Sequence, residues 1–192
     1  MRNATVFGPA PRMRFDLVLN NLTGLAWTKR EIQLISDGRS WRPMIHICDL
    51  VRACEMLLEV PGDLVNGQIF NVGDDRLNYR VRDVAKEVQH AFPGSTVVLG
   101  GNCRDERSYK VSFHKIRDWL GFTCEYDVEW GAKELYRLYE QVRLTSHVFE
   151  SCSFTPLKRL CTLLSSGVVD KNLYWRTKPP IDDDIGIDLV AA

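Results

Sequence analysis

Short apolar runs alternate with segments of helical periodicity along this chain, which is the pattern of a mixed α/β protein. The runs that fit short strands occupy residues 4–7, 32–35, 44–47, 68–72 and 96–99. Apolar residues recur at helical spacing over residues 15–26, 50–58, 81–92, 116–120, 128–142 and 156–165. Gly-Pro or Pro-Gly pairs at 8–9, 61–62 and 93–94 separate elements. The strands and helices do not complete a doubly wound set, so the pattern predicts a partial α/β fold.

Three side chains stand where the predicted helices begin. Asp49, Asn78 and Asp127 each precede or open a helical segment. A side-chain oxygen at such a position accepts a backbone N–H of the first helical turn. We therefore expect these three residues to act as N-caps.

Composition narrows the class of protein. The 192 residues carry 26% charged side chains with a net charge of zero, so nothing indicates bulk binding of nucleic acid. The six cysteines form no Cys-x-x-Cys pair, which argues against zinc and favours reduced thiols in a cytoplasmic protein. No apolar run approaches about 18 residues, so no membrane span is predicted. We assign no metal ligands, and a few local arginines must carry any phosphate recognition.

Residues 36–49 contain the strongest candidate for such recognition. A Ser-Asp-Gly turn leads through Arg42 into a short apolar strand, which ends at His46 and Asp49. The planar guanidinium of Arg42 could hold a diphosphate with two parallel hydrogen bonds. The alternative is a surface ion pair. We interpret His46 as a hydrogen-bonded structural histidine.

The order of motifs resembles the C-terminal, substrate-binding part of the NAD-dependent epimerase/dehydratase family, the extended short-chain dehydrogenases that act on nucleotide sugars. The motifs are Thr-Val-Phe-Gly-Pro (5–9), Arg-Phe-Asp-Leu-Val (14–18), Ser-Asp-Gly (36–38), Arg-Pro-Met-Ile-His-Ile-Cys-Asp (42–49), Phe-Asn-Val-Gly (70–73) and Arg-Ser-Tyr (107–109). The resemblance covers about residues 2–145. It implies an α/β, partial Rossmann-like fold that lacks the N-terminal βαβ units and consists mostly of the small substrate-binding subdomain.

The resemblance also implies an organisation into three parts. Residues 1–30 would form the last Rossmann-type strand and a linking helix, and residues 31–146 the nucleotide-sugar subdomain. Residues 147–192 would form a partly helical C-terminal extension with a loosely docked or disordered tail.

Specific residues are implicated by the same resemblance. The substrate-binding candidates are Arg42, Arg14, Phe15, Asn21, Gln33, Leu34, Arg104, Asp105 and Arg107. The cofactor-binding candidates, beside a nicotinamide of NAD or NADP, are Val6, Phe7, Gly8 and Pro9. Simpler interpretations remain open: a strand end and turn at 6–9, a solvated Arg14 with Phe15 in the core, a packed Asn21, a plain edge strand at 33–35 and an ordinary charged loop at 102–107.

The chemistry of the family depends on two motifs that this sequence does not supply in the expected place. No Gly-x-x-Gly-x-x-Gly occurs to hold a cofactor pyrophosphate. The Tyr-x-x-x-Lys spacing occurs at residues 174–178, directly before two prolines, and we interpret it as coincidence. We therefore assign no catalytic residue and expect on the order of 150 further residues upstream. The strand at residues 5–7 would then present an exposed edge.

The predicted function is the substrate-binding portion of an NAD(P)-dependent nucleotide-sugar epimerase or dehydratase. Two alternatives remain: a non-catalytic nucleotide-sugar-binding or partner module, and one half of a split enzyme. The expected partners are a nucleotide sugar and, in the split case, a chain carrying the Rossmann half; a homodimer is also possible.

Overall fold

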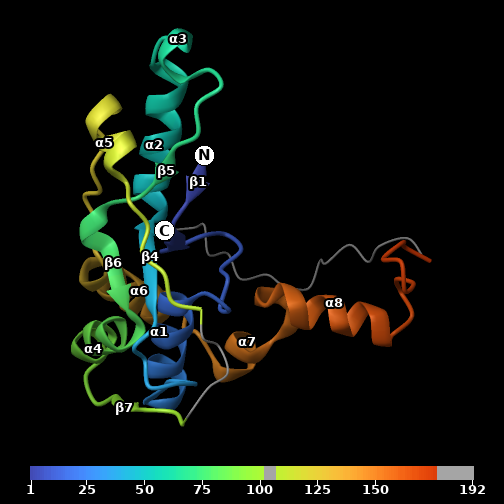
Figure 1. Cartoon of the computed structure of the whole chain (residues 1–192). Helices are drawn as coiled ribbons and strands as arrows, with labels where there is room; N and C mark the ends of the chain where they lie inside the picture. Colours follow the sequence, from blue (N-terminus) through green and yellow to red (C-terminus); the bar gives the residue numbers. More distant parts are fainter. Residues whose placement is uncertain (102–106, 177–192) are drawn as a thin grey trace.

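The computed structural model describes residues 1–101 and 107–176, which form a tall α/β body and an arm projecting from it (Figure 1). The strands are β1 (Arg2–Asn3), β2 (Thr5–Phe7), β3 (Glu31–Gln33), β4 (Trp41–His46), β5 (Asn71–Val72), β6 (Asn78–Arg80) and β7 (Thr96–Val98). The α-helices are α1 (Val18–Lys29), α2 (Ile47–Glu59), α3 (Gly62–Val65), α4 (Val81–Ala91), α5 (His114–Leu120), α6 (Val128–Gln141), α7 (Ser146–Glu150) and α8 (Pro156–Ser165). Two 3₁₀ turns complete the set, η1 (Asp75–Leu77) and η2 (Cys152–Phe154).

Three small sheets carry the body. The largest has the order β2–β4–β6, with β2 parallel to β4 and β6 antiparallel to it. The pairs β1–β5 and β3–β7 are both parallel. Parallel pairing needs long crossover connections, and helices supply them here. Strand β2 lies at an edge of its sheet within the described residues, as the sequence predicts.

Two hydrophobic cores fill the body. The first lies among α1, α4 and α6, where Leu19, Val88 and Leu135 are fully buried. The second lies between α2 and α5, around Ile45, Phe113 and Ile116. The apolar stripes that predicted these helices are the faces that enter the cores. Close packing extends to the backbone in the first core: a Cβ at Gly131 would lie 2.5 Å from the ring of Phe7.

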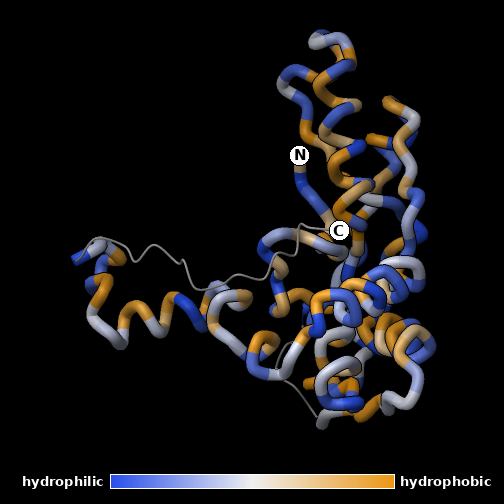
Figure 2. The backbone as a smooth tube through the Cα atoms, turned by 180° about the vertical axis from the view of Figure 1, so that it is seen from behind, coloured by the Kyte–Doolittle hydropathy of each residue, from blue (hydrophilic) through white to orange (hydrophobic). Residues whose placement is uncertain are grey.

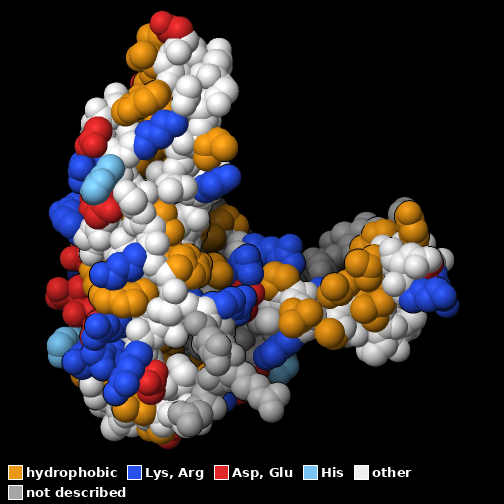
Figure 3. All heavy atoms as spheres, viewed as in Figure 1, with side chains coloured by type: hydrophobic (Ala, Val, Ile, Leu, Met, Phe, Trp, Pro, Cys, Tyr) orange, Lys and Arg blue, Asp and Glu red, His pale blue; other side chains and the backbone are white. Residues whose placement is uncertain are grey.

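Residues 146–176 form an arm on the side of the body (Figures 1 and 2). Its root is apolar, because Phe149 and Phe154 pack against Phe15. Their ring centres lie 4.9 and 5.5 Å from the centre of the Phe15 ring. Helix α8 follows and buries none of its residues. Figure 3 shows hydrophobic side chains along the exposed arm, and Leu157 is 70% exposed. No helix among the described residues is long and apolar enough to cross a bilayer.

The helix starts test the predicted caps. The prediction that Asp127 is an N-cap is confirmed, since its carboxylate accepts the backbone N–H of Trp130 at 2.8 Å. The prediction for Asn78 is wrong: α4 begins later, at Val81, and Asn78 lies in β6. Its amide instead makes two 3.0 Å hydrogen bonds with the backbone of Val111, which joins two distant segments. The added strand β6 is too short to produce a readable alternation in the sequence.

Candidate functional site

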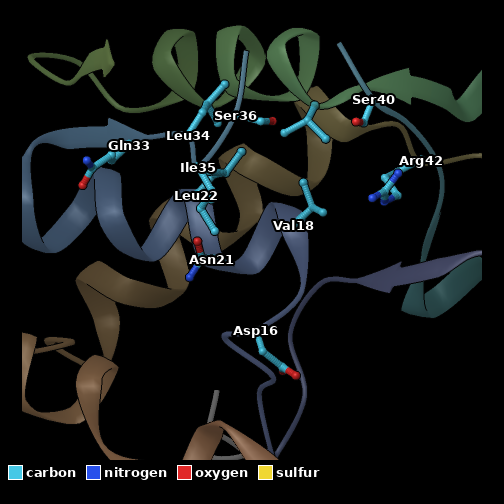
Figure 4. Close-up of a pocket in the computed structure, with 11 residues that line it drawn as sticks. Asp16, Val18, Asn21, Leu22, Gln33, Leu34, Ile35, Ser36, Ser40 and Arg42 are labelled. Atoms are coloured by element: carbon cyan, nitrogen blue, oxygen red, sulfur yellow. The ribbon is translucent and has the colours of Figure 1, made fainter. Parts of the chain in front are cut away.

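A cavity of about 230 Å³ lies beside α1 and the start of α4; we call it the α1–α4 cavity (Figure 4). Its described lining residues are Asp16, Val18, Asn21, Leu22, Gln33, Leu34, Ile35, Ser36, Ser40, Arg42 and Val81. Four of the nine substrate-binding candidates, Asn21, Gln33, Leu34 and Arg42, are therefore brought together from α1, from β3 with the residue after it, and from β4. In Figure 4, Gln33 and Arg42 lie at opposite ends of the row of side chains.

Arg42 is held in place by backbone carbonyl groups. Its Nη1 donates to the carbonyl oxygens of Trp41 at 2.8 Å and of Arg107 at 2.6 Å. Its guanidinium also lies 5.5 Å from the centre of the Tyr109 ring. These contacts limit the rotamers of the long side chain, so less entropy is lost when it binds an anion. Arg107 thus meets Arg42 through its backbone.

The rest of the α1–α4 cavity combines apolar and amide groups. Val18 and Leu22 of α1 and Leu34 provide aliphatic surface. The amide of Asn21 is oriented by donation from Nδ2 to the carbonyl oxygen of Phe15 at 2.9 Å, which leaves Oδ1 as an acceptor. An aliphatic slot with amide groups and a positioned guanidinium can hold a flat ring and an attached anion.

Arg14 faces a different space from Arg42. It lines a second cavity of about 560 Å³ beside the β2 edge, the edge-strand cavity. Its guanidinium forms two bonds to Asp16, from Nε to Oδ1 at 3.0 Å and from Nη2 to Oδ2 at 2.6 Å. This pairing lowers the pKa of the Asp16 carboxyl and raises the pKa of Arg14. Phe15, between them in sequence, is buried in the first core and lines neither cavity.

The four cofactor-binding candidates separate in the structure. Val6 lines the edge-strand cavity, whereas Phe7 is buried in the first core. Gly8 has φ +111°, and a Cβ there would lie 2.5 Å from Nε2 of His46. The imidazole ring therefore already fills the space beside the Gly8 backbone. Pro9 is half-buried and lies outside both linings. Within the described residues, Val6 is the one member of this set that lines either of the two cavities.

His46 and Asp49 hold the scaffold behind Arg42. His46 is fully buried; its Nδ1 accepts from the backbone N–H of Cys48 at 3.3 Å, and Nε2 lies 2.9 Å from Oε2 of Glu134. The predicted hydrogen-bonded histidine is confirmed, and it is His46 that caps α2. The prediction that Asp49 caps this helix is wrong. Asp49 lies within the first turn, and its buried carboxylate accepts the backbone N–H groups of residues 125 and 126 at 3.0 and 3.1 Å.

Two candidates, Arg104 and Asp105, lie outside the described residues. Described residues near both ends of that segment contact residues that line the α1–α4 cavity: the N–H of Gly100 donates to the carbonyl oxygen of Ser36 at 3.2 Å, and the carbonyl oxygen of Arg107 accepts from Arg42. Tyr174 of the Tyr-x-x-x-Lys spacing lies on the arm, 72% exposed. No cluster of three metal-ligating side chains occurs in the part of the chain that the structure describes.

Sequence reasoning missed several lining residues. Val18 and Leu22 belong to the apolar stripe of α1, a pattern that by itself indicates only core. Ser36 and Ser40 flank the Asp-Gly turn, whose Gly38 has φ +70°. Two hydroxyl groups beside a turn that leads to an arginine were a usable signal, because such groups can bind phosphate oxygens.

Comparison with known proteins relates this chain to one family. Residues 1–73 match the NAD dependent epimerase/dehydratase family, a shorter stretch than the one over which the motifs resemble it. This match relates the N-terminal part of the chain to the NAD-dependent epimerases and dehydratases.

Solved structures extend the likeness in fold beyond residue 73. A UDP-glucuronic acid 4-epimerase from Bacillus cereus has a TM-score of 0.62 at 19% identity, over 73% of this chain and 44% of that one. A UDP-glucose 4-epimerase from Thermotoga maritima has 0.58 at 21%, over 74% and 46%. An NAD-dependent NDP-hexosamine 5,6-dehydratase involved in tunicamycin biosynthesis has 0.60 at 20%, over 73% and 45%. The chain therefore has part of the fold of these enzymes, and it spans less than half of their length.

Proposed function

We propose that the α1–α4 cavity binds the nucleoside diphosphate of a nucleotide sugar. The chain would then be the substrate-binding portion of an NAD(P)-dependent nucleotide-sugar epimerase or dehydratase, corresponding to the C-terminal part of that fold. The observation that carries the proposal is the meeting of Arg42 with Asn21, Gln33 and Leu34 in one cavity. The family match over residues 1–73 and the shared fold support the relation to nucleotide-sugar epimerases and dehydratases.

The cavity suggests how such a ligand would lie. The aliphatic side chains of Val18, Leu22 and Leu34 would contact the nucleobase, whose polar edges would meet the amide groups of Asn21 and Gln33. The diphosphate would lie at the other end, on the guanidinium of Arg42. Arg107 would contribute beside Arg42, whose guanidinium donates to its carbonyl oxygen.

Binding measurements test this proposal directly. We expect titration calorimetry with UDP-, GDP-, CDP- and TDP-sugars to detect one preferred nucleotide. Arg42→Ala should weaken it about 10- to 100-fold, since hydrogen bonds to charged groups are worth about 1.5–3 kcal/mol. Arg42→Lys should recover part of the loss, because the charge stays and the planar fork does not.

The matched control is Arg137→Ala, which removes an exposed arginine from α6, away from the α1–α4 cavity lining. It should bind as the unmodified protein does. If the folded protein binds none of the nucleotides, or if Arg42→Ala and Arg137→Ala bind equally well, the proposal is wrong.

A specific observation favours a split enzyme as the second candidate. Strand β2 has an unpaired edge within the described residues, and Thr5 and Val6 of this strand line the large edge-strand cavity. A chain supplying the cofactor half could add a strand there. Native purification followed by mass spectrometry tests this idea: a stoichiometric partner with a Gly-rich βαβ unit supports it, and a monomer without such a partner contradicts it. A non-catalytic binding module would bind the nucleotide sugar and show neither partner nor turnover.

A further inference from the structure

The α1–α4 cavity contains a carboxylate, although the proposed ligand is an anion. Asp16 is the acidic side chain among the described lining residues, and it shares that lining with Arg42. Figure 4 shows it on the loop that leads into α1. A carboxylate that faces a bound diphosphate repels it, and the repulsion is stronger in a partly buried site than in water. Binding therefore requires that the charge of Asp16 be offset.

Protonation does not offset it at neutral pH. The pKa of Asp16 is lowered, chiefly by its hydrogen bonds with Arg14, so the carboxylate stays ionised. Its partner is the guanidinium of Arg14, which engages both carboxylate oxygens. The side chain of Asp16 is 30% exposed and that of Arg14 is 51% exposed, so the ion pair lies partly shielded from solvent.

The turn that carries this pair is fixed to α1. The carbonyl oxygen of Arg14 accepts from Nδ2 of Asn20 at 3.3 Å, and that of Phe15 accepts from Nδ2 of Asn21 at 2.9 Å. Asn20 is buried, so the turn is held from inside the protein. The two residues of the ion pair line different cavities: Asp16 lines the α1–α4 cavity and Arg14 lines the edge-strand cavity.

We infer that Arg14 is a positioning residue, which makes the α1–α4 cavity accept an anion by neutralising and holding Asp16, and that it does not itself bind the diphosphate. The inference rests on the proposed function. It differs from the direct contact that the sequence motif implies for Arg14. It also gives Asp16 a defined effect: unpaired, this carboxylate would lower the affinity for every anionic ligand of the cavity.

A double-mutant cycle separates the two roles of Arg14. The four proteins are the unmodified chain, Arg14→Ala, Asp16→Asn and the double variant, titrated with UDP, GDP, CDP and TDP. We expect Arg14→Ala to weaken the preferred diphosphate about fivefold or more, because Asp16 is left unpaired. Asp16→Asn should bind at least as tightly as the unmodified chain, and the double variant should return to within about twofold of it.

A second readout excludes a purely structural effect. The loss caused by Arg14→Ala should grow with the charge of the ligand, from the uncharged nucleoside through the monophosphate to the diphosphate. A distorted cavity would weaken all three alike. Arg14→Gln, which keeps the aliphatic stem and a donor but not the charge, should behave as Arg14→Ala and provides a folded substitute if the alanine variant unfolds.

The outcomes distinguish this inference from the proposed function. If Arg14→Ala weakens binding as much in the Asp16→Asn variant as in the unmodified chain, while Arg42→Ala weakens binding as expected above, Arg14 is a direct ligand; the inference is then overturned and the proposed function stands. A loss that is the same for the nucleoside and the diphosphate overturns it as well. If the unmodified chain binds no nucleotide, both fail together.

Discussion

The body and the arm contain similar amphipathic helices with opposite fates. Helix α6 buries Val128, Ala132 and Leu135 in the first core. Helix α8 carries Leu157 and Leu164 at a helical spacing of seven residues, yet none of its residues is buried. The periodicity of a sequence shows that a helix has an apolar face, and tertiary structure decides what that face meets. In the body α6 packs against α1 and α4, whereas among the described residues α8 packs mainly against the η2 turn at the root of the arm.

That root determines how the arm is attached. Phe149 packs against the backbone of α1 so closely that a Cβ at Gly24 would lie 2.2 Å from its ring. Lys29 at the end of α1 and Glu150 at the end of α7 form an ion pair of 2.8 Å. Because both charged groups are about half exposed, the aromatic contacts contribute more than this pair does. The arm is thus stabilised at one end, and the difference from the body can be measured.

The largest expected difference in the free energy of unfolding is between two leucine variants, one in α6 of the body and one in α8 of the arm. Leu135→Ala in α6 removes a fully buried side chain and should lower the free energy of unfolding by about 3 kcal/mol, within the range of about 2–5 kcal/mol found for such cavities. Leu157→Ala in α8 removes a side chain that is 70% exposed and should cost less than about 0.5 kcal/mol. Urea unfolding followed by circular dichroism measures both. A cost for Leu157→Ala close to that of Leu135→Ala would show that α8 is covered in solution.

The sequence was sufficient to predict these helices but not their surroundings. The residues 156–165 predicted as helix coincide with α8, because Pro156 suits a first helical position and the leucines repeat at helical spacing. The same signal in α1 indicates a core face, although Val18 also lines the α1–α4 cavity. Cavities depend on how elements meet, which a local pattern does not contain.

Polar contacts between residues far apart in the sequence were the second feature that the sequence could not predict. Asp49 precedes a helix in the sequence and so resembles a cap, yet its carboxylate binds backbone groups 76 and 77 residues away. Arg42 was identifiable because its motif is local and its chemistry is specific. Its contact with the carbonyl oxygen of Arg107, 65 residues away, was not. The sequence therefore predicted four of the lining residues, Asn21, Gln33, Leu34 and Arg42, but not the backbone contacts that hold Arg42 in place.

An intermediate difference is expected for two aspartates with similar hydrogen bonds. Asp49 in the body accepts two backbone N–H groups and is fully buried, with Arg52 bonded at 2.7 Å. Asp170 in the arm also accepts two, those of Asn172 and Tyr174 at 2.8 and 3.0 Å, in an exposed turn. Asp49→Ala should cost about 3 kcal/mol, because two partly buried N–H donors and the Arg52 guanidinium lose their acceptor, and Asp170→Ala less than about 1 kcal/mol.

Thermal and urea unfolding of the two alanine variants give this comparison, with Asp49→Asn as an intermediate case that keeps one acceptor oxygen. Equal costs for Asp49→Ala and Asp170→Ala would mean that the turn at residues 170–174 is as protected as the body. That result would contradict the picture of an arm held only at its root.

The mildest test leaves the sequence unchanged and compares the rates at which two cysteines are alkylated. Cys124 is 7% exposed in the second core, and burial raises the pKa of its thiol to about 12. At pH 8 only about one molecule in ten thousand carries the reactive thiolate, and access requires opening of the core. Cys161 of α8 is exposed. We expect iodoacetamide to modify Cys161 within minutes and Cys124 only at the rate of unfolding, as located by peptide mass spectrometry. Adding urea below the unfolding midpoint should speed the modification of Cys124 alone, because Cys161 is already accessible to the reagent. Similar modification rates for both thiols without urea would show that the second core is open.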